Sequence, residues 1–443
     1  MNRQKIVEEL KKFIAIESVS TDPKRKDQIV KAAEYIKTKL VSLGFEVRLL
    51  TKDPFPPLVV AHKKVSDTAK TIGIYAHYDV QPEDPADEWK TPAFTLTSKE
   101  GKFYARGIAD DKGHLWQNIV AIEELVQENK LESNIICVFE GEEETGSLNF
   151  EPYVKEASDL LSKADVFYIT DVGMHERNIP QIEYGLRGIL YFTLSVKIGE
   201  RDLHSGIYGN RVYNPINVLA DLVASIKDVN TGKIKLPGFY DKVRKIPKEE
   251  LEVLKKGAVS DEQERKEAQT YTVTTVDGLP VYLSSKIAPS FDCHGILSGY
   301  TGEGSKTVIP KSAMVKFSFR LVEHQDPESI EKMVREYIQK KLPQGVKYEL
   351  TTHGNAAPFY TDIENEYVKK TVEILEKEFG NKVLFNRSGG SIPAAEILQR
   401  LFKKPVVLTG FILPDCNLHS PNENYDEEIF WKGIEVLKRV YGI

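Results

Sequence analysis

The sequence has few cysteines and no excess of positive charge. Its 443 residues include three cysteines, Cys137, Cys293 and Cys416, which lie far apart and form no CxxC pair. A disulfide framework or a thiolate zinc site therefore has little support, and a reducing, cytoplasmic location is predicted. Asp and Glu number 66 against 60 Lys and Arg, so the net charge is −6. Since no Lys/Arg-rich run stands out, nucleic acid is not expected as a partner.

The sequence also lacks a long hydrophobic run. No apolar stretch approaches the roughly 18 residues that span a bilayer. The start of the chain is charged and amphipathic, unlike a secretory signal, so no membrane partner is expected. Apolar residues make up 41% of the chain and charged residues 28%, as in packed globular proteins. At roughly 100–200 residues per domain, this length predicts about two domains.

The first part of the chain alternates helical and strand patterns. Apolar residues recur at helical spacing in 28–44, 113–129 and 151–164. Short apolar runs bounded by turn residues predict strands at 45–50, 56–62, 70–77, 134–140 and 165–170. Strands that alternate with helices predict an α/β fold, with a mostly parallel sheet covered by helices on both faces.

The pattern changes near Gly185. Residues 186–365 are predicted to form a strand, a helix, a long irregular section, a strand, a helix and a strand, which suits a smaller α+β sandwich. A long helix at 364–380 and a buried strand at 404–412 then resume the first pattern. We therefore expect a discontinuous domain formed by 1–185 and 366–443, with 186–365 inserted into it.

Polar residues stand where the predicted strands of the first domain end. His77 and Asp79 close one strand, the glutamates 142–144 follow the next, Asp171 follows a third, and His419 comes after the strand at 404–412. Because the carboxyl ends of parallel strands share one edge of a sheet, these distant segments are expected to converge.

Each of these segments has a plainer explanation when it is taken alone. A lone histidine such as His77 is more often a hydrogen-bonded structural residue than a ligand. The acidic run EGEEETGS is typical of a solvated helix start. Asp110 and Asp111 could serve as turn residues or as a helix cap.

Taken together, the segments supply imidazoles and carboxylates and no cysteine. Such ligands suit Zn²⁺, Mn²⁺ or Co²⁺. Five ligands are too many for one catalytic ion with an open position, but they suit two ions roughly 3.5–4 Å apart that share a bridging carboxylate. The sequence therefore predicts a hydrolase with a pair of metal ions.

Motifs spread over the whole chain resemble those of one metallopeptidase family. The chain is similar to the carnosinase and cytosolic non-specific dipeptidase branch of the family that also holds aminoacylase, glutamate carboxypeptidase and succinyl-diaminopimelate desuccinylase. The motifs are HYDVQP (77–82), RGIADDKG (106–113), EGEEETGS (140–147), YGLRG (184–188), DLHSGIYG (202–209), TVIP (307–310), GGSIP (389–393) and HSPNE (419–423).

The resemblance implies roles for residues of the first domain. Asp79 would orient the imidazole of His77, and Glu143 would be the general base, because the family places the base directly before the liganding glutamate. Asp110 would bridge the two ions. The implied metal ligands are His77, Asp110, Glu144, Asp171 and His419.

The resemblance also implies contacts to the substrate. His204 would donate to the oxyanion in the partner subunit's site, and Arg320, Thr307 and His353 would contact the substrate from the inserted domain. Ser391 would meet it in the Gly-rich GGSIP loop of the catalytic domain. An exposed strand-end arginine and an ordinary surface histidine are the alternatives for Arg320 and His353. The remaining histidines match no motif and are interpreted as structural or solvated: His62, His114, His175, His294 and His324.

These implications lead to an expected function. The expected enzyme is a dipeptidase or carboxypeptidase with two divalent ions, in which Glu143 is the general base that activates a water. It would act on small peptides with a free C-terminal carboxylate. It would form a homodimer through the inserted domain, which would also act as a lid. The runner-up is a deacylase of N-acyl amino acids, because the same metal pair cleaves any amide. A catalytically silent binding protein is the third candidate, and it is opposed by the presence of all the ligands and the base.

Overall fold

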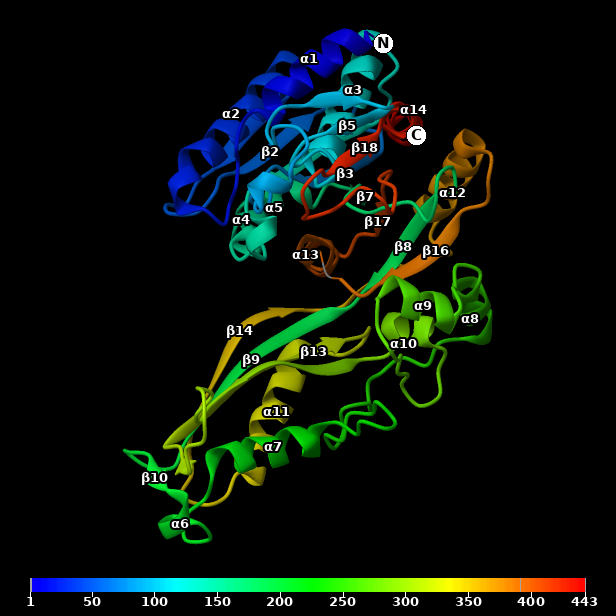
Figure 1. Cartoon of the computed structure of the whole chain (residues 1–443). Helices are drawn as coiled ribbons and strands as arrows, with labels where there is room; N and C mark the ends of the chain where they lie inside the picture. The colour runs from blue at the N-terminus through cyan, green and yellow to red at the C-terminus, as the bar shows by residue number, and fades with distance from the viewer. Residues whose placement is uncertain (1, 391, 443) are drawn as a thin grey trace. The chain divides into compact units, whose positions relative to one another are not determined.

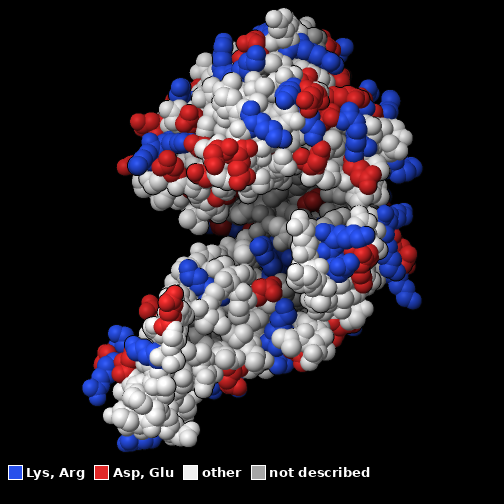
Figure 2. All heavy atoms as spheres, in the orientation of Figure 1, with Lys and Arg blue, Asp and Glu red and all other residues white. Residues whose placement is uncertain are grey.

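The computed structural model describes residues 2–390 and 392–442, and it divides the chain into two compact units (Figure 1). Unit 1 comprises Met1–Tyr184, Thr361–Asn386 and Ile392–Ile443. Unit 2 comprises Gly185–Tyr360 and Arg387–Ser391. Among the described residues, no helix is both long and apolar enough to cross a membrane. On the face drawn in Figure 2, acidic and basic side chains are interspersed.

Unit 1 is built on a twisted sheet whose strands follow the order β1-β2-β6-β3-β7-β17-β8. Strands β6, β3, β7 and β17 are parallel, whereas β1, β2 and β8 add antiparallel edges. The predicted α/β class with a mostly parallel central sheet is confirmed. The strands are β1 (Glu46–Leu50), β2 (Leu58–Lys63), β3 (Thr71–His77), β6 (Asn134–Glu140), β7 (Val166–Ile169), β8 (Gln181–Leu186) and β17 (Val406–Thr409), and β16 (Leu384–Ser388) pairs with β8.

Helices cover both faces of this sheet, because neighbouring strand residues point to opposite sides. On β7, the ring of Phe167 packs against Phe402 of α13, while the hydroxyl of Tyr168 lies 3.1 Å from that of Thr371 on α12. Figure 1 shows α4 and α13 on the side of the sheet opposite to α3 and α14. The helices are α1 (Arg3–Ile14), α2 (Lys26–Ser42), α3 (Lys112–Gln127), α4 (Phe150–Glu156), α5 (Ser158–Leu161), α12 (Glu366–Phe379), α13 (Pro393–Phe402) and α14 (Glu427–Tyr441).

Helix α3 positions the aspartate pair, and several short elements complete unit 1. Helix α3 is buried on nearly all sides, because it packs against β3, α1 and α14. Its first residue follows Asp111 directly, so the helix start places the aspartate pair at the edge of the sheet. The minor elements are the 3₁₀ turns η1 (Pro23–Arg25), η2 (Ala86–Glu88) and η3 (Glu143–Thr145), and a small sheet of β18 (Asn424–Asp426), β5 (Lys102–Tyr104) and β4 (Thr97–Lys99).

Unit 2 is an antiparallel sheet with helices on one face. Its strands follow the order β11-β13-β9-β14. On β9, Leu190 and Phe192 are buried in the core shared with α7 and α11, while Tyr191 and Thr193 lie half-buried on the other face. The elements are β9 (Gly188–Lys197), β11 (Ser290–Leu297), β13 (Ser312–Leu321), β14 (Lys347–Ala356), α7 (Pro215–Ile226) and α11 (Pro327–Lys341).

The section of unit 2 predicted to be irregular contains regular elements. It holds the edge strand β11 and three short helices, so the prediction was wrong there. Helix α9 has almost no apolar residue to reveal a period, and β11 exposes most of its side chains, so neither element shows the usual hydrophobic pattern. The helices are α8 (Lys248–Lys255), α9 (Asp261–Glu267) and α10 (Val281–Ile287); α6 (Ser205–Tyr208), β10 (Leu203–His204), β12 (Val308–Ile309) and β15 (Phe359–Tyr360) complete the unit.

Candidate metal centre

The carboxyl ends of the parallel strands bring the acidic and imidazole side chains of unit 1 together. β3 ends at His77, which is in register with Glu140 at the end of β6, and the glutamates 142–144 follow at once. β7 ends two residues before Asp171. The sheet therefore positions these segments at one edge, as ligand sites of open parallel sheets are positioned.

Asp110 lies between two imidazoles. Its Oδ1 is 2.9 Å from Nε2 of His77, and its Oδ2 is 2.9 Å from Nε2 of His419. Burial opposes ionisation of this carboxyl, but the hydrogen bonds from His419 and His77 hold its pKa well below the usual value. Asp110 is therefore an ionised carboxylate with one oxygen directed at each histidine.

Two groups of possible metal ligands surround this carboxylate. In each group, one ligand atom per residue lies within 4.8 Å of the others. Nε2 of His77 is 3.8 Å from Oδ2 of Asp171, and Nε2 of His419 is 3.4 Å from Oε2 of Glu144. The first group is His77, Asp111 and Asp171, and the second is Asp110, Glu144 and His419.

The carboxyl of Glu144 is short of positive partners. Its Oε2 accepts a hydrogen bond of 2.7 Å from Gln81, but its Oε1 is buried and has no hydrogen-bond partner among the described residues. Burial and the charge of Asp110 raise the pKa of Glu144 to about 8. A divalent cation would satisfy this oxygen and compensate the charge, so the donor set fits a metal ion.

Asp171 shows the same deficit. Burial, with the nearby charges of Asp111 and Asp110, raises its pKa well above the usual value. The pKa of His419 is also raised, to about 9, because of its hydrogen bond to Asp110. For a histidine, a raised pKa favours the charged form. The cluster thus carries more negative charge than its imidazoles neutralise, which again suits cations.

Glu143 differs from its neighbours in having a free carboxyl. Its side chain makes no hydrogen bond or ion pair with the described residues, whereas its backbone N–H donates to Oδ1 of Asp79 over 3.2 Å. Burial first, and then the charges of Asp110 and Asp79, raise the pKa of Glu143 to about 7. A carboxylate with such a pKa can accept and return a proton near neutral pH.

Asp79 supports more of the site than a single histidine. Nδ1 of His77 lies 3.1 Å from the backbone oxygen of Asp79 and 3.3 Å from its Oδ1. The same carboxylate accepts the backbone N–H of Glu143 and, over 3.1 Å, that of Glu144. Ser20 donates to its Oδ2 over 2.6 Å. One buried aspartate therefore positions His77 and the two glutamates together.

Asp111 was not among the predicted ligands, although it belongs to the first group. Both of its oxygens are already engaged: Oδ2 accepts the backbone N–H of His77 and Oδ1 lies 3.1 Å from Nδ1 of His114. Nε2 of His114 accepts the N–H of Phe411, so the neutral ring carries its proton on Nδ1 and donates to Asp111. Asp111 and His114 thus position the loop that carries Asp110.

A buried ion pair also supports this loop, and spacing in the sequence did not reveal it. Arg106 and Glu423 are 1% and 0% exposed, and their charged atoms are 2.7 Å apart. Glu423 also accepts the backbone N–H groups of Gly107, Ala109 and Asp110. Because Glu423 follows His419 by four residues, the pair joins the two loops that carry Asp110 and His419. The motifs RGIADDKG and HSPNE contain both residues, which is the signal that could have found them.

The other predicted site residues that the structure describes belong to unit 2. His204 pairs with Val308 between β10 and β12, next to Thr307. Its Nδ1 accepts the N–H of Gly206 over 3.0 Å, so the neutral ring carries a donor at Nε2. His353 lies 2.7 Å from the hydroxyl of Thr193. Ser391 lies outside the described residues, and Arg320 is half-buried on β13.

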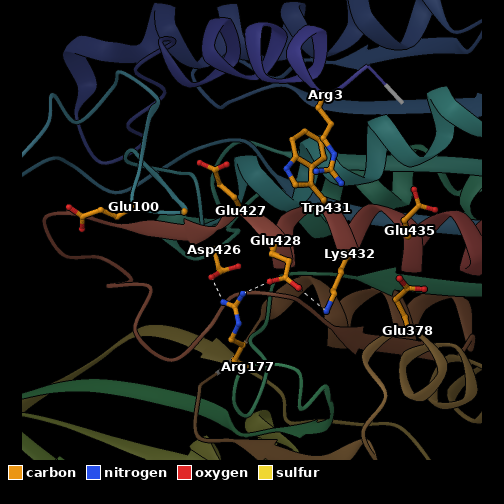
Figure 3. Close-up of a pocket in the computed structure, with 11 residues that line it drawn as sticks. Arg3, Glu100, Arg177, Glu378, Asp426, Glu427, Glu428, Trp431, Lys432 and Glu435 are labelled. Atoms are coloured by element: carbon orange, nitrogen blue, oxygen red, sulfur yellow. Dashed lines mark hydrogen bonds and ion pairs between the residues drawn. The ribbon is translucent and has the colours of Figure 1, made fainter.

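Unit 1 has a further hollow of about 830 Å³, which none of the predicted site residues lines. Figure 3 shows Arg177 directed toward Asp426 and Glu428, with which it forms ion pairs, and Lys432 pairs with Glu428 as well. Arg3 lies over the ring of Trp431, at 4.9 Å from its centre. The basic side chains of this hollow are therefore already paired.

Comparison with known proteins places this chain in a class. The model of "Peptidase family M20/M25/M40" matches residues 73–442. The chain belongs to this family, and it is a metallopeptidase with the α/β sheet and the candidate metal ligands described above.

Individual relatives narrow the comparison. The chain is 30% identical over 451 residues to the Cys-Gly metallodipeptidase dug1 of Schizosaccharomyces pombe, which covers 98% of this chain and 94% of that protein. It is 30% identical over 458 residues to the Beta-Ala-His dipeptidase of Homo sapiens, with 99% and 89% covered. A solved M20 family metallo-carboxypeptidase, Sso-CP2 from Sulfolobus solfataricus, has a TM-score of 0.88 and 32% identity, covering 99% of this chain and 98% of that one. The predicted resemblance to the dipeptidase branch is confirmed.

Proposed function

We propose that this metallopeptidase hydrolyses dipeptides or other short peptides with a free C-terminal carboxylate, with two divalent cations per subunit. The observation that carries the proposal is Asp110, whose two oxygens each lie 2.9 Å from a different imidazole. A carboxylate in that position can bridge two ions. One ion would be held by His77 and Asp171, the other by Glu144 and His419. Zn²⁺ is the proposed metal, and Mn²⁺ or Co²⁺ suit the same donors.

The chain's own groups divide the work of amide hydrolysis. When bound, the ions polarise the amide carbonyl and lower the pKa of water toward neutrality. Glu143 takes the proton of the attacking water and passes it to the leaving amine. The Nε2–H of His204 donates to the oxyanion as its charge develops, a contribution of roughly 3–4 kcal/mol for such a donor.

Unit 2 supplies the contacts proposed for the substrate. Arg320 has a planar guanidinium that can bind a carboxylate through two parallel hydrogen bonds, which favours peptides with a free C-terminus. Thr307, His353 and Ser391 are proposed as further substrate contacts. Two relatives are named for Cys-Gly and Beta-Ala-His dipeptides, which supports a dipeptide as the substrate.

A substrate panel tests this proposal. Purified protein loaded with Zn²⁺ or Mn²⁺ is assayed against Cys-Gly, β-Ala-His and a set of Ala-X dipeptides, and in parallel against N-acetyl and N-succinyl amino acids. We expect release of free amino acids from the dipeptides. Turnover of the N-acyl amino acids alone would replace the dipeptidase with a deacylase, and no turnover of either series with metal bound would contradict both.

We also propose that the protein forms a homodimer through unit 2 and that His204 acts in the partner's site. The family resemblance supports this, and so do the large apolar side chains exposed beside His204: Ile207 and Tyr213 are 57% and 54% exposed. Mixing His204→Ala with Glu143→Ala subunits tests it. If half of the dimers are mixed and each has one intact site, activity should return toward about a quarter of wild type. No recovery after verified subunit exchange would contradict the shared site.

A cytoplasmic location is proposed as well. Its support is that all three cysteines are free, and that Cys293 is exposed as a thiol. Fractionation of the producing cell would test it.

A further inference from the structure

Unit 2 contains two partly buried arginines, Arg187 and Arg320, whose guanidinium groups have no partner among the described residues. The described residues offer neither group a hydrogen bond or a carboxylate at ion-pair distance, and Nε of Arg187 is buried and unsatisfied. Arg320 is in register with Ile189 of the neighbouring strand β9, and Arg187 precedes Ile189 by two residues. Since side chains two residues apart on an extended chain share a face, both arginines lie on one face of the unit 2 sheet.

Among the described residues, the buried arginines Arg106 and Arg387 and the partly buried Arg244 are all paired with glutamates. Arg106 lies 2.7 Å from Glu423, and Arg387 lies 2.7 Å from Glu323. Arg244 lies 2.6 Å from Glu250. Burying a guanidinium without a partner is costly, because the charge loses its hydration and gains no hydrogen bond in return. Arg187 and Arg320 therefore depart from the rule that the rest of this protein follows.

The two guanidinium groups also act on each other. Burial first, and then the charge of Arg320, lowers the pKa of Arg187 to about 10, and burial lowers that of Arg320. Asp292 is the carboxylate that opposes both shifts, but it is exposed and its oxygens meet Ser290 and Lys227 at 3.1 and 3.4 Å. The local charge therefore stays positive.

The loop beside Arg187 leaves room for its guanidinium. The backbone N–H of Arg187 donates to the carbonyl of Ser388 over 3.3 Å. A Cβ atom added at Gly389 would lie 2.9 Å from Nη2 of Arg187, so a larger residue there would displace the guanidinium. The glycine thus leaves space for the guanidinium of Arg187.

We propose that Arg187 and Arg320 together bind one carboxylate, the C-terminal carboxylate of the peptide substrate. The proposal rests on the function proposed above and adds Arg187, a residue of the YGLRG motif, as a determinant of specificity. Each guanidinium offers five N–H donors and an ionised carboxylate has about four acceptor sites, so two arginines can saturate it. A negative ligand also relieves the repulsion between the two positive groups, which a single arginine would not require.

The test compares a dipeptide with its C-terminal amide. Ala-Gly and Ala-glycinamide are assayed with the wild type, Arg187→Met, Arg320→Met and Arg187→Lys. We expect Arg187→Met to raise KM for Ala-Gly by about 10- to 100-fold with kcat little changed, and to leave the amide almost unaffected. Arg187→Lys should recover part of the loss, because it restores the charge without the planar fork. An unchanged ratio of KM between acid and amide would overturn the proposal.

Thermal unfolding without substrate separates this role from a structural one. Arg187→Met should leave the Tm unchanged or raise it, because it removes a partly buried charge that has no partner among the described residues. The matched control, Arg244→Met, should lower the Tm, because it removes the ion pairs of Arg244 with Glu250 and Glu323. A Tm loss in Arg187→Met as large as that of the control would overturn the proposal.

A probe that needs no turnover separates failure of the site from failure of the function. The metal-loaded protein is modified with phenylglyoxal in the presence and in the absence of propionate, a ligand that offers only a carboxylate. Mass spectrometry then identifies the modified arginines. Propionate should protect Arg187 and Arg320 together and leave Arg244 unaffected. If the wild type hydrolyses no peptide, the proposed function fails, and protection of both arginines still supports the carboxylate site. Absence of protection at both positions overturns the site, whatever the enzyme hydrolyses.

Discussion

The two units each contain a cluster of charged side chains that is at least partly shielded from water, and the clusters differ in sign and in pairing. In unit 1, imidazoles lie among the carboxylates, and Asp110 has a histidine on each oxygen at 2.9 Å. In unit 2, strand register places Arg187 and Arg320 near each other, and neither guanidinium has a counter-charge at ion-pair distance among the described residues. Like charges repel strongly where water is excluded, so each cluster calls for a ligand of opposite sign. The acidic cluster fits cations, and the basic pair fits an anion.

The clusters also differ in what supports them. The carboxylates of unit 1 follow strand ends, and Asp79, Asp111 and Glu423 hold the surrounding backbone through N–H groups. The arginines of unit 2 are placed by strand register and one glycine-containing loop. A metal site needs these additional hydrogen bonds, because they fix the orientation of each ligand. Two flexible arginine side chains can bind a carboxylate without such a network.

The largest effect is expected at the glutamates that follow β6. Glu143→Ala should lower kcat by about 10²- to 10⁴-fold and keep its metal, because its carboxyl acts on a proton. Glu144→Ala should lose metal, because its unsatisfied oxygen is the one that a cation would meet. Metal content by elemental analysis, measured beside kcat, checks both. Loss of metal in Glu143→Ala would exchange the two roles.

The second-largest effect is expected when a buried arginine loses its partner. Glu423→Ala would leave Arg106 buried without its partner and free three backbone N–H groups, so we expect a loss of about 3–5 kcal/mol in the free energy of unfolding. Urea unfolding of the metal-free protein measures this without interference from metal binding. A loss below about 1 kcal/mol would mean that pairing matters little for buried arginines here.

Glu142 gives a smaller effect in the same loop. Its carboxylate is buried and accepts the backbone N–H and the side-chain amide of Asn149 at 2.5 and 2.9 Å. Glu142→Ala should therefore destabilise the protein by about 1–3 kcal/mol while metal content stays normal. The exposed Glu132→Ala is the control and should change stability by less than about 0.5 kcal/mol. Equal unfolding curves for the two variants would show that this glutamate supports nothing.

The smallest expected effect is the release of protons when metal ions bind. The pKa values of about 8 for Glu144 and about 9 for His419 mean that both groups are largely protonated at pH 7 in the metal-free protein. Metal ions need the deprotonated forms, and burial also raises the pKa of Asp171, so loading should release at least about two protons at pH 7 and fewer at higher pH. Calorimetry in buffers of different ionisation heat measures the release.

Binding at the basic pair should behave differently. Arg187, with a pKa of about 10, keeps its proton at pH 7 with or without a bound carboxylate. Propionate binding should therefore exchange almost no proton in the same calorimetric experiment. A proton release on propionate binding as large as that on metal loading would remove the distinction between the two clusters.

Much of unit 1 could be predicted from the sequence, because its strands show up as local hydrophobic patterns. β3, β6 and β7 are continuous apolar runs, as buried parallel strands are, and His77 and Asp171 stand at or just after their ends. Parallel topology then brings strand ends to one edge without further information. In unit 2, the charged helix α9 and the exposed strand β11 have no such pattern, and the prediction missed them.

The chemistry of the donors was a property of the sequence alone. Histidines and carboxylates after buried strands, with no cysteine among them, predict a site for divalent cations from the sequence alone. Only the tertiary structure decided which distant groups come together: Arg106 pairs with Glu423, whereas Arg187 and Arg320 have no acid at ion-pair distance among the described residues. The physical reason is that hydrogen-bond and ion-pair partners depend on which distant segments pack together, and spacing along the chain does not contain that information.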